Sequence, residues 1–269
     1  MKQYHRALTI AGSDSGGGAG IQADLKTFSA LGCFGMSVIT ALTAQNTLAV
    51  TAIHSLPAAF IAAQLDAVLG DIGVDAVKIG MLHSPEVIAA VVQGLRRHGV
   101  GNIVVDPVMV AKSGDTLLRK DAVDALRDVL LPMADLITPN LPEASVLLDR
   151  PVVGIDDMEP AARDLAALGC GAVLIKGGHL NDSESIDILY LADSGLVLPL
   201  TALRVDTLNT HGTGCTLSSA VAAGLARGRS MEDAVREAKS FVTGAIRAAA
   251  DYQIGGGHGP VHHFHAFWR

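Results

Sequence analysis

The chain has 269 residues, of which 49% are hydrophobic and only 17% are charged, so the composition excludes disorder and predicts one large folded domain over residues 1–269. Its formal net charge of −7, with no run of Lys and Arg, excludes nucleic acid as a principal partner. No window approaches the roughly 18 consecutive apolar residues of a membrane span, and the three cysteines are too few for a disulfide framework. We therefore expect a cytoplasmic protein without a membrane partner.

Short apolar runs alternate with helical segments from one end of the chain to the other. The first run, residues 7–12, predicts a buried strand that leads through a glycine-rich loop to a helix at 21–31. Further strands are predicted at 36–42, 75–80, 102–107, 135–139 and 172–178, and a hairpin at 186–190 and 196–200. Further helices are predicted at 57–70, from 84–86 onward, at 120–130, from 141–143 onward, and at 159–168, 217–225 and 231–250.

This alternation is typical of right-handed βαβ units. We therefore expect an α/β fold with a mostly parallel central sheet that is covered by helices on both faces. Ligands of such folds bind beyond the carboxyl ends of the strands. Nearly every polar or glycine-rich segment follows a predicted strand, so the sequence predicts one binding rim.

Two common nucleotide motifs fit poorly. No G-x-x-x-x-G-K-S/T pattern occurs, which excludes the usual P-loop. Residues 18–23 match a relaxed G-x-G-x-x-A dinucleotide pattern, but the second strand ends at Gln45 and Asn46, without the acidic residue that binds ribose. A dehydrogenase is therefore disfavoured.

The segment 206–216 is a polar loop, interrupted by glycines, that runs directly into a helix. Small residues let backbone N–H groups converge, and the helix N-terminus adds a positive dipole, so this loop predicts an anion site. Such surroundings lower the pKa of a thiol, so Cys215 is expected to be accessible as thiolate near neutral pH. An ordinary glycine turn with a buried cysteine behind it is the alternative interpretation.

Among three candidate polar side chains, Gln45 and Asp24 have two interpretations each. Gln45 offers a donor and an acceptor suited to an aminopyrimidine-like edge, although an amide bonded to its own loop is the favoured reading. Asp24 lies on the first turn of a helix, where a capping or dipole role competes with a ligand role. Asp106 ends an apolar strand, so its carboxylate is expected on the rim.

Three further features lie towards the carboxyl end. Asn140 and Glu143 stand three residues apart at a helix start, which suits a hydrated Mg²⁺ or, preferably, a capping arrangement. Lys176 ends a buried strand before two glycines, so its cation is expected above backbone that a phosphate can approach. The tail at 255–265 contains four histidines, and a packed or flexible tail is favoured over metal binding.

The motifs together resemble the ribokinase superfamily and, within it, the hydroxymethylpyrimidine/phosphomethylpyrimidine kinases of thiamin biosynthesis. The resemblance covers essentially the whole chain and implies a ribokinase-like three-layer α/β/α fold. Besides the loop at 206–216, its carriers are residues 11–24, 40–46, 106–109, 138–140, 176–179 and 257–261.

The resemblance implies ATP-dependent phosphorylation of 4-amino-5-hydroxymethyl-2-methylpyrimidine and then of its monophosphate. It implies an anion hole at Gly212, Thr213 and Gly214, with Cys215 as the base where most sugar-kinase relatives have aspartate. Its implied pyrimidine contacts are Gly12, Asp24, Gln45, Met81 and Val108. Its implied ATP contacts are Lys176, Thr210 and His211, and its implied Mg²⁺ and water-organising residues are Asp106, Asn140 and Glu143.

The partners implied are ATP, a small pyrimidine alcohol and a second copy in a homodimer, and a monovalent cation is left open. A pyridoxal or pyridoxine kinase is the nearest rival, and Gln45 favours an aminopyrimidine over a hydroxypyridine. A non-catalytic pyrimidine- or nucleotide-binding regulator is the rival from another class. A regulator without catalytic activity is disfavoured by the presence of the Cys215 loop, Asp106 and Lys176.

Overall fold

One nine-stranded sheet organises the residues that the computed structural model describes, which are 2–109, 120–178 and 183–268. Residues 112–115, between the strand predicted at 102–107 and the helix predicted at 120–130, lie outside these described residues, as does His179. The strand order is β3-β2-β1-β4-β5-β6-β7-β8-β9. The strands are β1 (His5–Asp14), β2 (Cys33–Gln45), β3 (Val50–Ser55), β4 (Ala76–Ile79), β5 (Ile103–Val105), β6 (Leu136–Ile137), β7 (Ala172–Lys176), β8 (Glu184–Leu191) and β9 (Val197–Leu203).

The six strands from β2 to β7 in this order run parallel, whereas β3, β8 and β9 pair antiparallel with their neighbours. The predicted mostly parallel sheet and the predicted hairpin, now β8 and β9, are therefore confirmed. The sequence prediction missed β3, which carries mainly exposed side chains and so lacks a buried apolar run.

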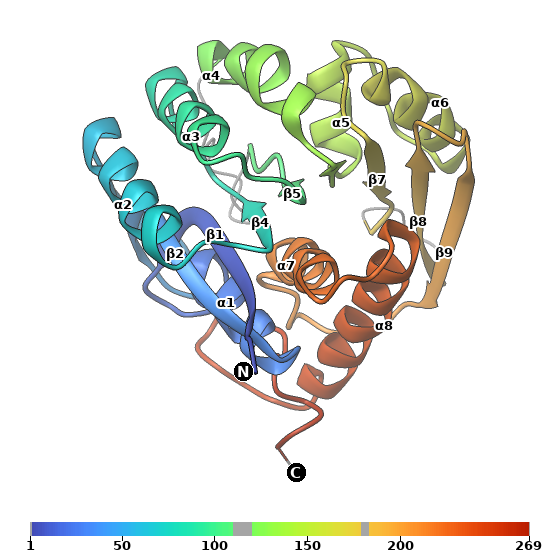
Figure 1. Cartoon of the computed structure of the whole chain (residues 1–269). Coiled ribbons are helices and arrows are strands. Elements are labelled where there is room, and N and C mark those ends of the chain that lie inside the picture. The colour runs from blue at the N-terminus through green and yellow to red at the C-terminus, as the bar shows by residue number, and fades with distance from the viewer. Residues whose placement is uncertain (1, 110–119, 179–182, 269) are drawn as a thin grey trace.

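Helices cover both faces of the sheet, which confirms the three-layer α/β/α architecture (Figure 1). The helices are α1 (Gly20–Ala30), α2 (Ala58–Asp71), α3 (Pro85–Arg97), α4 (Lys120–Ala125), α5 (Leu141–Leu148), α6 (Ile155–Ala166), α7 (Thr213–Ala226) and α8 (Met231–Ala249). A π-helical turn (Leu126–Leu130) and a 3-10 turn (Leu131–Met133) follow α4, so the predicted helix at 120–130 changes its winding. Helices α2 to α6 lie on one face, and α1, α7 and α8 on the other (Figure 1).

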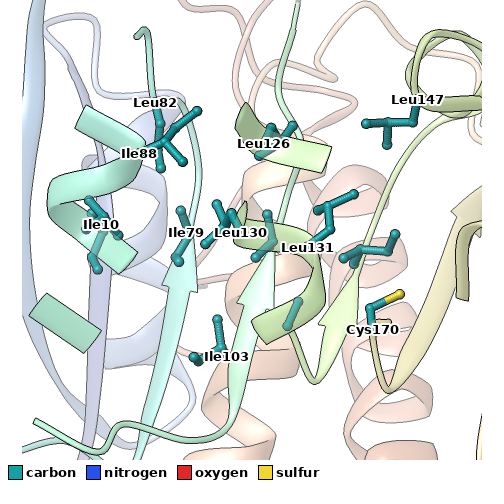
Figure 2. Close-up of a cluster of buried hydrophobic side chains, with 14 of the residues drawn as sticks. Ile10, Ile79, Leu82, Ile88, Ile103, Leu126, Leu130, Leu131, Leu147 and Cys170 are labelled. Carbon is teal, nitrogen blue, oxygen red and sulfur yellow. The ribbon is translucent and has the colours of Figure 1, made fainter. Parts of the chain in front are cut away.

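The two faces of the sheet carry side chains of different size because successive strand residues point in opposite directions. Leu8 and Ile10 point towards α2 to α6, whereas Ala7 points towards α7. The larger cluster includes Ile10, Ile79 and Ile103 from neighbouring strands and Ile88 of α3, which lies beside Leu82 (Figure 2). Burying one such side chain stabilises the fold by roughly 1.5–3 kcal/mol.

Among the described helices, α7 has the largest share of buried residues, and it lies at the centre of its layer (Figure 1). Its residues from Thr216 to Ala226 are all buried. Most of them are small, which lets the helix approach the alanine-rich face of the sheet closely. The start of α7 is therefore held rigidly where the strands end.

Helix α7 begins at Thr213 instead of the predicted 217. The residue before it, Gly212, has a φ of 78°, a left-handed conformation that glycine adopts at no steric cost. The earlier start brings Cys215 from the end of a loop into the first turn of the helix.

In the part of the chain that the structure describes, no helix is both long and apolar enough to cross a membrane.

Candidate active site

A cavity of about 1070 Å³ opens where the parallel strands end, at the rim on which the sequence predicts ligand binding. Segments that follow β1, β2, β4, β5, β6 and β7 line it, together with the start of α7. Every candidate site residue from the sequence lines this cavity except Asp24. Its volume is sufficient for a nucleotide beside a small ring, since pockets for drug-sized ligands occupy about 300–1,000 Å³.

The predicted anion loop is built by a tight turn against the glycine-rich loop after β1. A Cβ atom at Gly212 would collide with the backbone oxygen of Gly18, so the two loops touch through backbone alone. The hydroxyl of Thr213 donates to the carbonyl oxygen of Thr210 at 2.8 Å and fixes the turn. The first N–H groups of a helix have no partner within it, so the start of α7 presents donors and a positive dipole end to the cavity.

Cys215 does not have the lowered pKa that its position at a helix start predicts. Burial raises the pKa of its thiol to about 11, although Lys78 acts in the opposite direction. The negative charges of Asp24 and Asp106 add to the increase, whereas the backbone N–H of Gly20 opposes it. The expected lowering of the thiol pKa is therefore wrong, because desolvation in this enclosed turn outweighs the helix dipole.

Asp24 does not lie in the cavity, so the structure contradicts its implied role as a pyrimidine contact. Its side chain is fully buried, and its two oxygens each lie 2.9 Å from Nζ of Lys78. The hydroxyls of Thr9 and Ser219 each donate to it at 2.6 Å. Asp24 is therefore an internal counterion, and the capping reading is not realised either, since Ala19 caps α1 without a side-chain bond.

Lys78 is a cavity-lining residue that the sequence reasoning missed. It occupies the middle of the apolar run that forms β4 and is fully buried. A charged residue inside a buried strand was the available signal, because such a group requires a partner.

A second ion pair lies beside the anion loop. Lys176 Nζ lies 2.8 Å from Oδ1 of Asp106 and 3.7 Å from Oε2 of Glu143. A Cβ added at Gly214 would lie 3.5 Å from both Lys176 Nζ and Asp106 Oδ2. The predicted phosphate-binding cation and rim carboxylate thus meet the anion loop at one point.

Around Lys176, burial and the neighbouring charges act on the pKa values of Asp106 and Glu143 in opposite directions. Burial acts to raise the pKa of Asp106, but Lys176 and Lys78 hold it below its usual range. Burial raises the pKa of Glu143 to about 7, with Lys176 opposing and Asp106 reinforcing the shift. Neighbouring carboxylates in a buried site favour an additional cation, because like charges disfavour joint ionisation.

Asn140 and Glu143 form the capping box that the sequence favoured. The backbone N–H of Asn140 donates to Oε2 of Glu143 at 2.7 Å, and the backbone N–H of Glu143 donates to Oδ1 of Asn140 at 2.8 Å. No cluster of three or more His, Cys, Asp or Glu side chains suited to a metal occurs among the described residues. The remaining side-chain oxygens of Asn140 and Glu143 and the carboxylate of Asp106 are hard donors, which fit a cation held through water.

His211 lies with the residues expected to bind the ring, and not with Lys176 as its implied ATP role requires. Its Nε2 lies 2.9 Å from Oδ2 of Asp14 and 3.5 Å from Nε2 of Gln45. Oε1 of Gln45 accepts a bond from the hydroxyl of Thr43 at 3.1 Å, so the favoured loop-amide reading describes part of its bonding. Gln45 still lines the cavity.

Asp14 is a further residue that the sequence reasoning missed. Its carboxylate accepts from the backbone N–H groups of Gly16, Gly18 and Ala19 at 2.8, 3.1 and 2.8 Å. Burial acts to raise the pKa of Asp14, but the bonds from His211 and these amides lower it. An Asp followed by glycines is a common turn signal, and here the turn orders the loop that faces α7.

The apolar side of the cavity is formed by Gly12, Met81 and Val108. A Cβ at Gly12 would lie 2.9 Å from Cε of Met81, so any larger residue at position 12 would displace the end of this methionine side chain. The hydroxyl of Thr40 donates to the carbonyl oxygen of Met81 at 2.9 Å and fixes the segment after β4. The arrangement suits one flat face of a small aromatic ring.

The cavity extends to a second compartment between the β8–β9 hairpin and α8. Val205, Val242 and Ile246 give it apolar walls. At its floor, Lys239 Nζ lies 2.8 Å from Oδ2 of Asp187. These residues come from segments far apart in the chain, so no local sequence motif indicated that they lie together.

The histidine-rich tail is packed, as favoured from the sequence. His211 donates its backbone N–H to the carbonyl oxygen of Gly259 at 2.9 Å, and Val261 donates back to His211 at 3.3 Å. The buried ring of His263 has its Nε2 3.1 Å from the hydroxyl of Thr216. The tail therefore holds the anion loop from its outer side.

Comparisons with known proteins show the family of the chain. A family model of phosphomethylpyrimidine kinase matches residues 14–262. The hydroxymethylpyrimidine/phosphomethylpyrimidine kinase of Rhizobium meliloti is 56% identical over 98% of this chain and 98% of its own length. The protein of the same name from Escherichia coli is 54% identical over the full length of both chains.

Solved structures of two related kinases share the fold. An ADP complex of Bacillus subtilis pyridoxal kinase has a TM-score of 0.90 at 39% identity, and the match covers 98% of this chain and 99% of that chain. The phosphomethylpyrimidine kinase of Clostridium difficile has a TM-score of 0.79 at 46% identity, covering 90% and 99%. The chain belongs to the phosphomethylpyrimidine kinase family, as its motifs had indicated.

Proposed function

We propose that this chain is an ATP-dependent kinase of thiamin biosynthesis that phosphorylates 4-amino-5-hydroxymethyl-2-methylpyrimidine and then its monophosphate. The observation that carries the proposal is one cavity in which a ring-sized apolar wall adjoins an anion loop and a buried lysine. The relatives with more than half of their residues identical bear the name of this activity.

The acceptor ring is assigned to the side of the cavity formed by Gly12, Gln45, Met81 and Val108. The amide of Gln45 pairs with the aminopyrimidine edge, and Met81 and Val108 contact the ring face. His211 extends this ring side through its neighbour Gln45. The hydroxymethyl group then points towards the start of α7.

ATP is assigned to the other side of the cavity. Its triphosphate passes Lys176 and Thr210, and its base occupies the compartment between the β8–β9 hairpin and α8. A similar pyridoxal kinase was solved with ADP, which supports a nucleotide in this family fold. Residues Gly212 to Gly214 stabilise the charge on the transferring group, because phosphoryl transfer depends mainly on positioning and electrostatics.

Mg²⁺, when bound, would neutralise the phosphate oxygens of ATP. The residues that would hold it through water are Asp106, Asn140 and Glu143, whose oxygens fit such an ion. Lys176 keeps Asp106 ionised and carries its own positive charge next to the loop. The activity assay, run with and without K⁺, tests whether a monovalent cation also assists.

In the reaction, the acceptor oxygen forms a bond to the γ-phosphorus while the bond to the β-phosphate oxygen breaks and ADP leaves. When the alcohol is the acceptor, its hydroxymethyl proton passes to the Cys215 thiolate. The monophosphate has already lost its protons near neutral pH, because its second pKa is about 6, and it needs no base. Because burial raises the pKa of this thiol to about 11, only a small fraction is ionised near neutral pH.

An ADP-release assay tests the proposed activity. It compares hydroxymethylpyrimidine, its monophosphate and pyridoxal side by side, each with and without Mg²⁺ and K⁺. We expect turnover with both pyrimidines. Turnover with pyridoxal alone would overturn the assignment in favour of a pyridoxal kinase, which the similar structures make the second candidate.

Replacing Cys215 tests its role as the base. We expect Cys215→Ala to bind ATP normally and to lose at least roughly 100-fold in turnover, since a general base contributes about 10²–10⁴-fold. Turnover of the native protein should rise about tenfold per pH unit between about pH 7 and 9, as the thiolate fraction does. Cys215→Asp should flatten this rise, because a carboxylate is already ionised. Near-native turnover in Cys215→Ala would remove the thiol from the mechanism.

A further inference from the structure

An ion pair that the proposed reaction does not use lies buried beneath the anion loop. Lys78 of β4 and Asp24 of α1 are both fully buried, with Nζ 2.9 Å from each carboxylate oxygen. Thr9 of β1 and Ser219 of α7 each donate a hydroxyl to Asp24 at 2.6 Å. One carboxylate thus joins two strands and two helices at a single point.

This pair is bonded to the helix that carries Cys215. Ser219 follows Cys215 by four residues on α7, and residues at that spacing lie on the same face of a helix. The face that carries the thiol is therefore the face that bonds Asp24. Lys78 also reaches the cavity, and a Cβ added at Gly80 would lie 3.0 Å from its Nζ.

Stability alone gives little reason for such a pair. Removing two charges from water is expensive, and apolar residues of similar volume often serve a core equally well or better. Lys78 also lines the cavity, as Cys215 does, and the charges of these two groups act on each other. Its position thus points to an effect on that thiol.

The charges around Cys215 oppose one another. Those that act on it come from four segments and are Lys78, Asp24, Asp106 and Lys176. Lys78 is the main one that opposes the effect of burial on the thiol. Asp106 and Lys176 are paired with each other, so Lys78 and its counterion Asp24 are the second balanced pair.

We propose that Lys78 is a positioning residue that stabilises the Cys215 thiolate, and that Asp24, held by Thr9 and Ser219, fixes the ammonium group beneath the sulfur. The catalytic consequence rests on the proposed function, in which this thiolate takes the acceptor proton. The effect on the thiol itself is a property of the free protein and does not depend on that function.

The test titrates Cys215 in the full chain without ligands. Cys33 and Cys170 are first replaced by Ala, so that thiolate absorbance near 240 nm and iodoacetamide alkylation report Cys215 alone. Into this parent we introduce Asp24→Asn, and separately Lys78→Met with Asp24→Asn. The double change leaves no unpaired buried charge and keeps the fold accessible if the single change destabilises it.

Opposite effects are expected from the two variants. Asp24→Asn leaves Lys78 without its counterion and should raise the alkylation rate at pH 8 at least about threefold, with the titration midpoint moved down. The double variant lacks the lysine and should lower that rate at least about threefold, with the midpoint moved up. Arg6→Met with Asp75→Asn is the matched control, since it removes an ion pair of the same charges at the amino-terminal ends of β1 and β4, away from the cavity, and its titration should equal that of the parent.

Turnover separates this inference from the proposed function. We expect the double variant to lose at least about threefold in kcat at pH 8 with both KM values within about twofold of the parent. An unchanged titration in both variants would overturn the role of Lys78, whatever the effect of Cys215→Ala. A shifted titration with unchanged kcat would support the Lys78–thiolate link and contradict Cys215 as the base.

Discussion

The thiol of Cys215 is governed by its immediate surroundings and not by its sequence motif. The start of a helix favours thiolate, and Lys78 adds to that preference. Burial has the larger effect and raises the pKa to about 11. The residue that the resemblance names as the base is thus mostly protonated in the free protein, and its neighbours decide how much thiolate forms.

Gly212 permits a residue-scale prediction because another glycine provides a matched control. Gly212 and Gly228 both have a φ of 78°, but a Cβ would strike the Gly18 backbone at the first and meet nothing within 4 Å at the second. Gly228→Ala should cost about 1–2 kcal/mol in unfolding free energy from the left-handed conformation alone. Gly212→Ala should cost more and lower turnover, because the anion loop must move.

Urea unfolding and steady-state kinetics measure both effects of these glycine changes. Equal losses of stability, with native turnover in Gly212→Ala, would show that the two loops do not need backbone contact.

At the scale of elements, the site depends on segments that meet from distant parts of the chain. The start of α7 is held by the glycine-rich loop on one side and by the C-terminal tail on the other. The tail contributes His263, whose ring is buried against Thr216. Burial lowers the pKa of His263 to about 4, so the tail packs with a neutral histidine.

This histidine makes the stability of the tail dependent on pH. The unfolded chain binds a proton at His263 below about pH 6.5, whereas the folded chain does so only below about pH 4. Its contribution is therefore complete above pH 6.5 and is lost as the pH falls to 4, up to about 3 kcal/mol in total. His263→Gln should remove this part of the acid destabilisation.

Urea unfolding at a series of pH values between 7 and 4 measures this loss of unfolding free energy. His258→Gln, an exposed histidine of the same tail, serves as the control and should follow the native curve. Identical slopes for all three proteins would contradict a buried neutral His263.

At the scale of the whole molecule, the sheet has an exposed edge at β3. The edge at β3 carries exposed side chains along nearly its whole length, including Ile53, which is 48% exposed. Phe60 at the start of α2 is also exposed. An edge strand with exposed apolar residues is a site for pairing with another chain. We therefore propose that the expected homodimer forms at the β3 edge.

Analytical ultracentrifugation tests this assembly. The native protein should sediment as a dimer, and Ile53→Asp should shift it to monomer because a charge would be buried in the interface. Val153→Asp, at a residue that is 72% exposed outside β3, is the control and should remain dimeric. A monomeric native protein, or a dimer unaffected by Ile53→Asp, would contradict this interface.

The sequence by itself determined the α/β architecture, the parallel sheet and the rim on which the site lies. Apolar runs at strand length and helical runs between them are local patterns, and strand ends in such a fold meet at one edge. The capping box of Asn140 and Glu143 and the hairpin were likewise readable, because each depends on residues close together in the chain.

Only the tertiary structure decided what depends on distant partners and on burial. It removed Asp24 from the cavity by pairing it with Lys78, and it placed His211 beside Asp14 and Gln45. It also reversed the expected ionisation of Cys215. The physical reason is common to all three, since charge pairing and desolvation depend on which groups the fold brings within a few ångströms, and no local pattern specifies that.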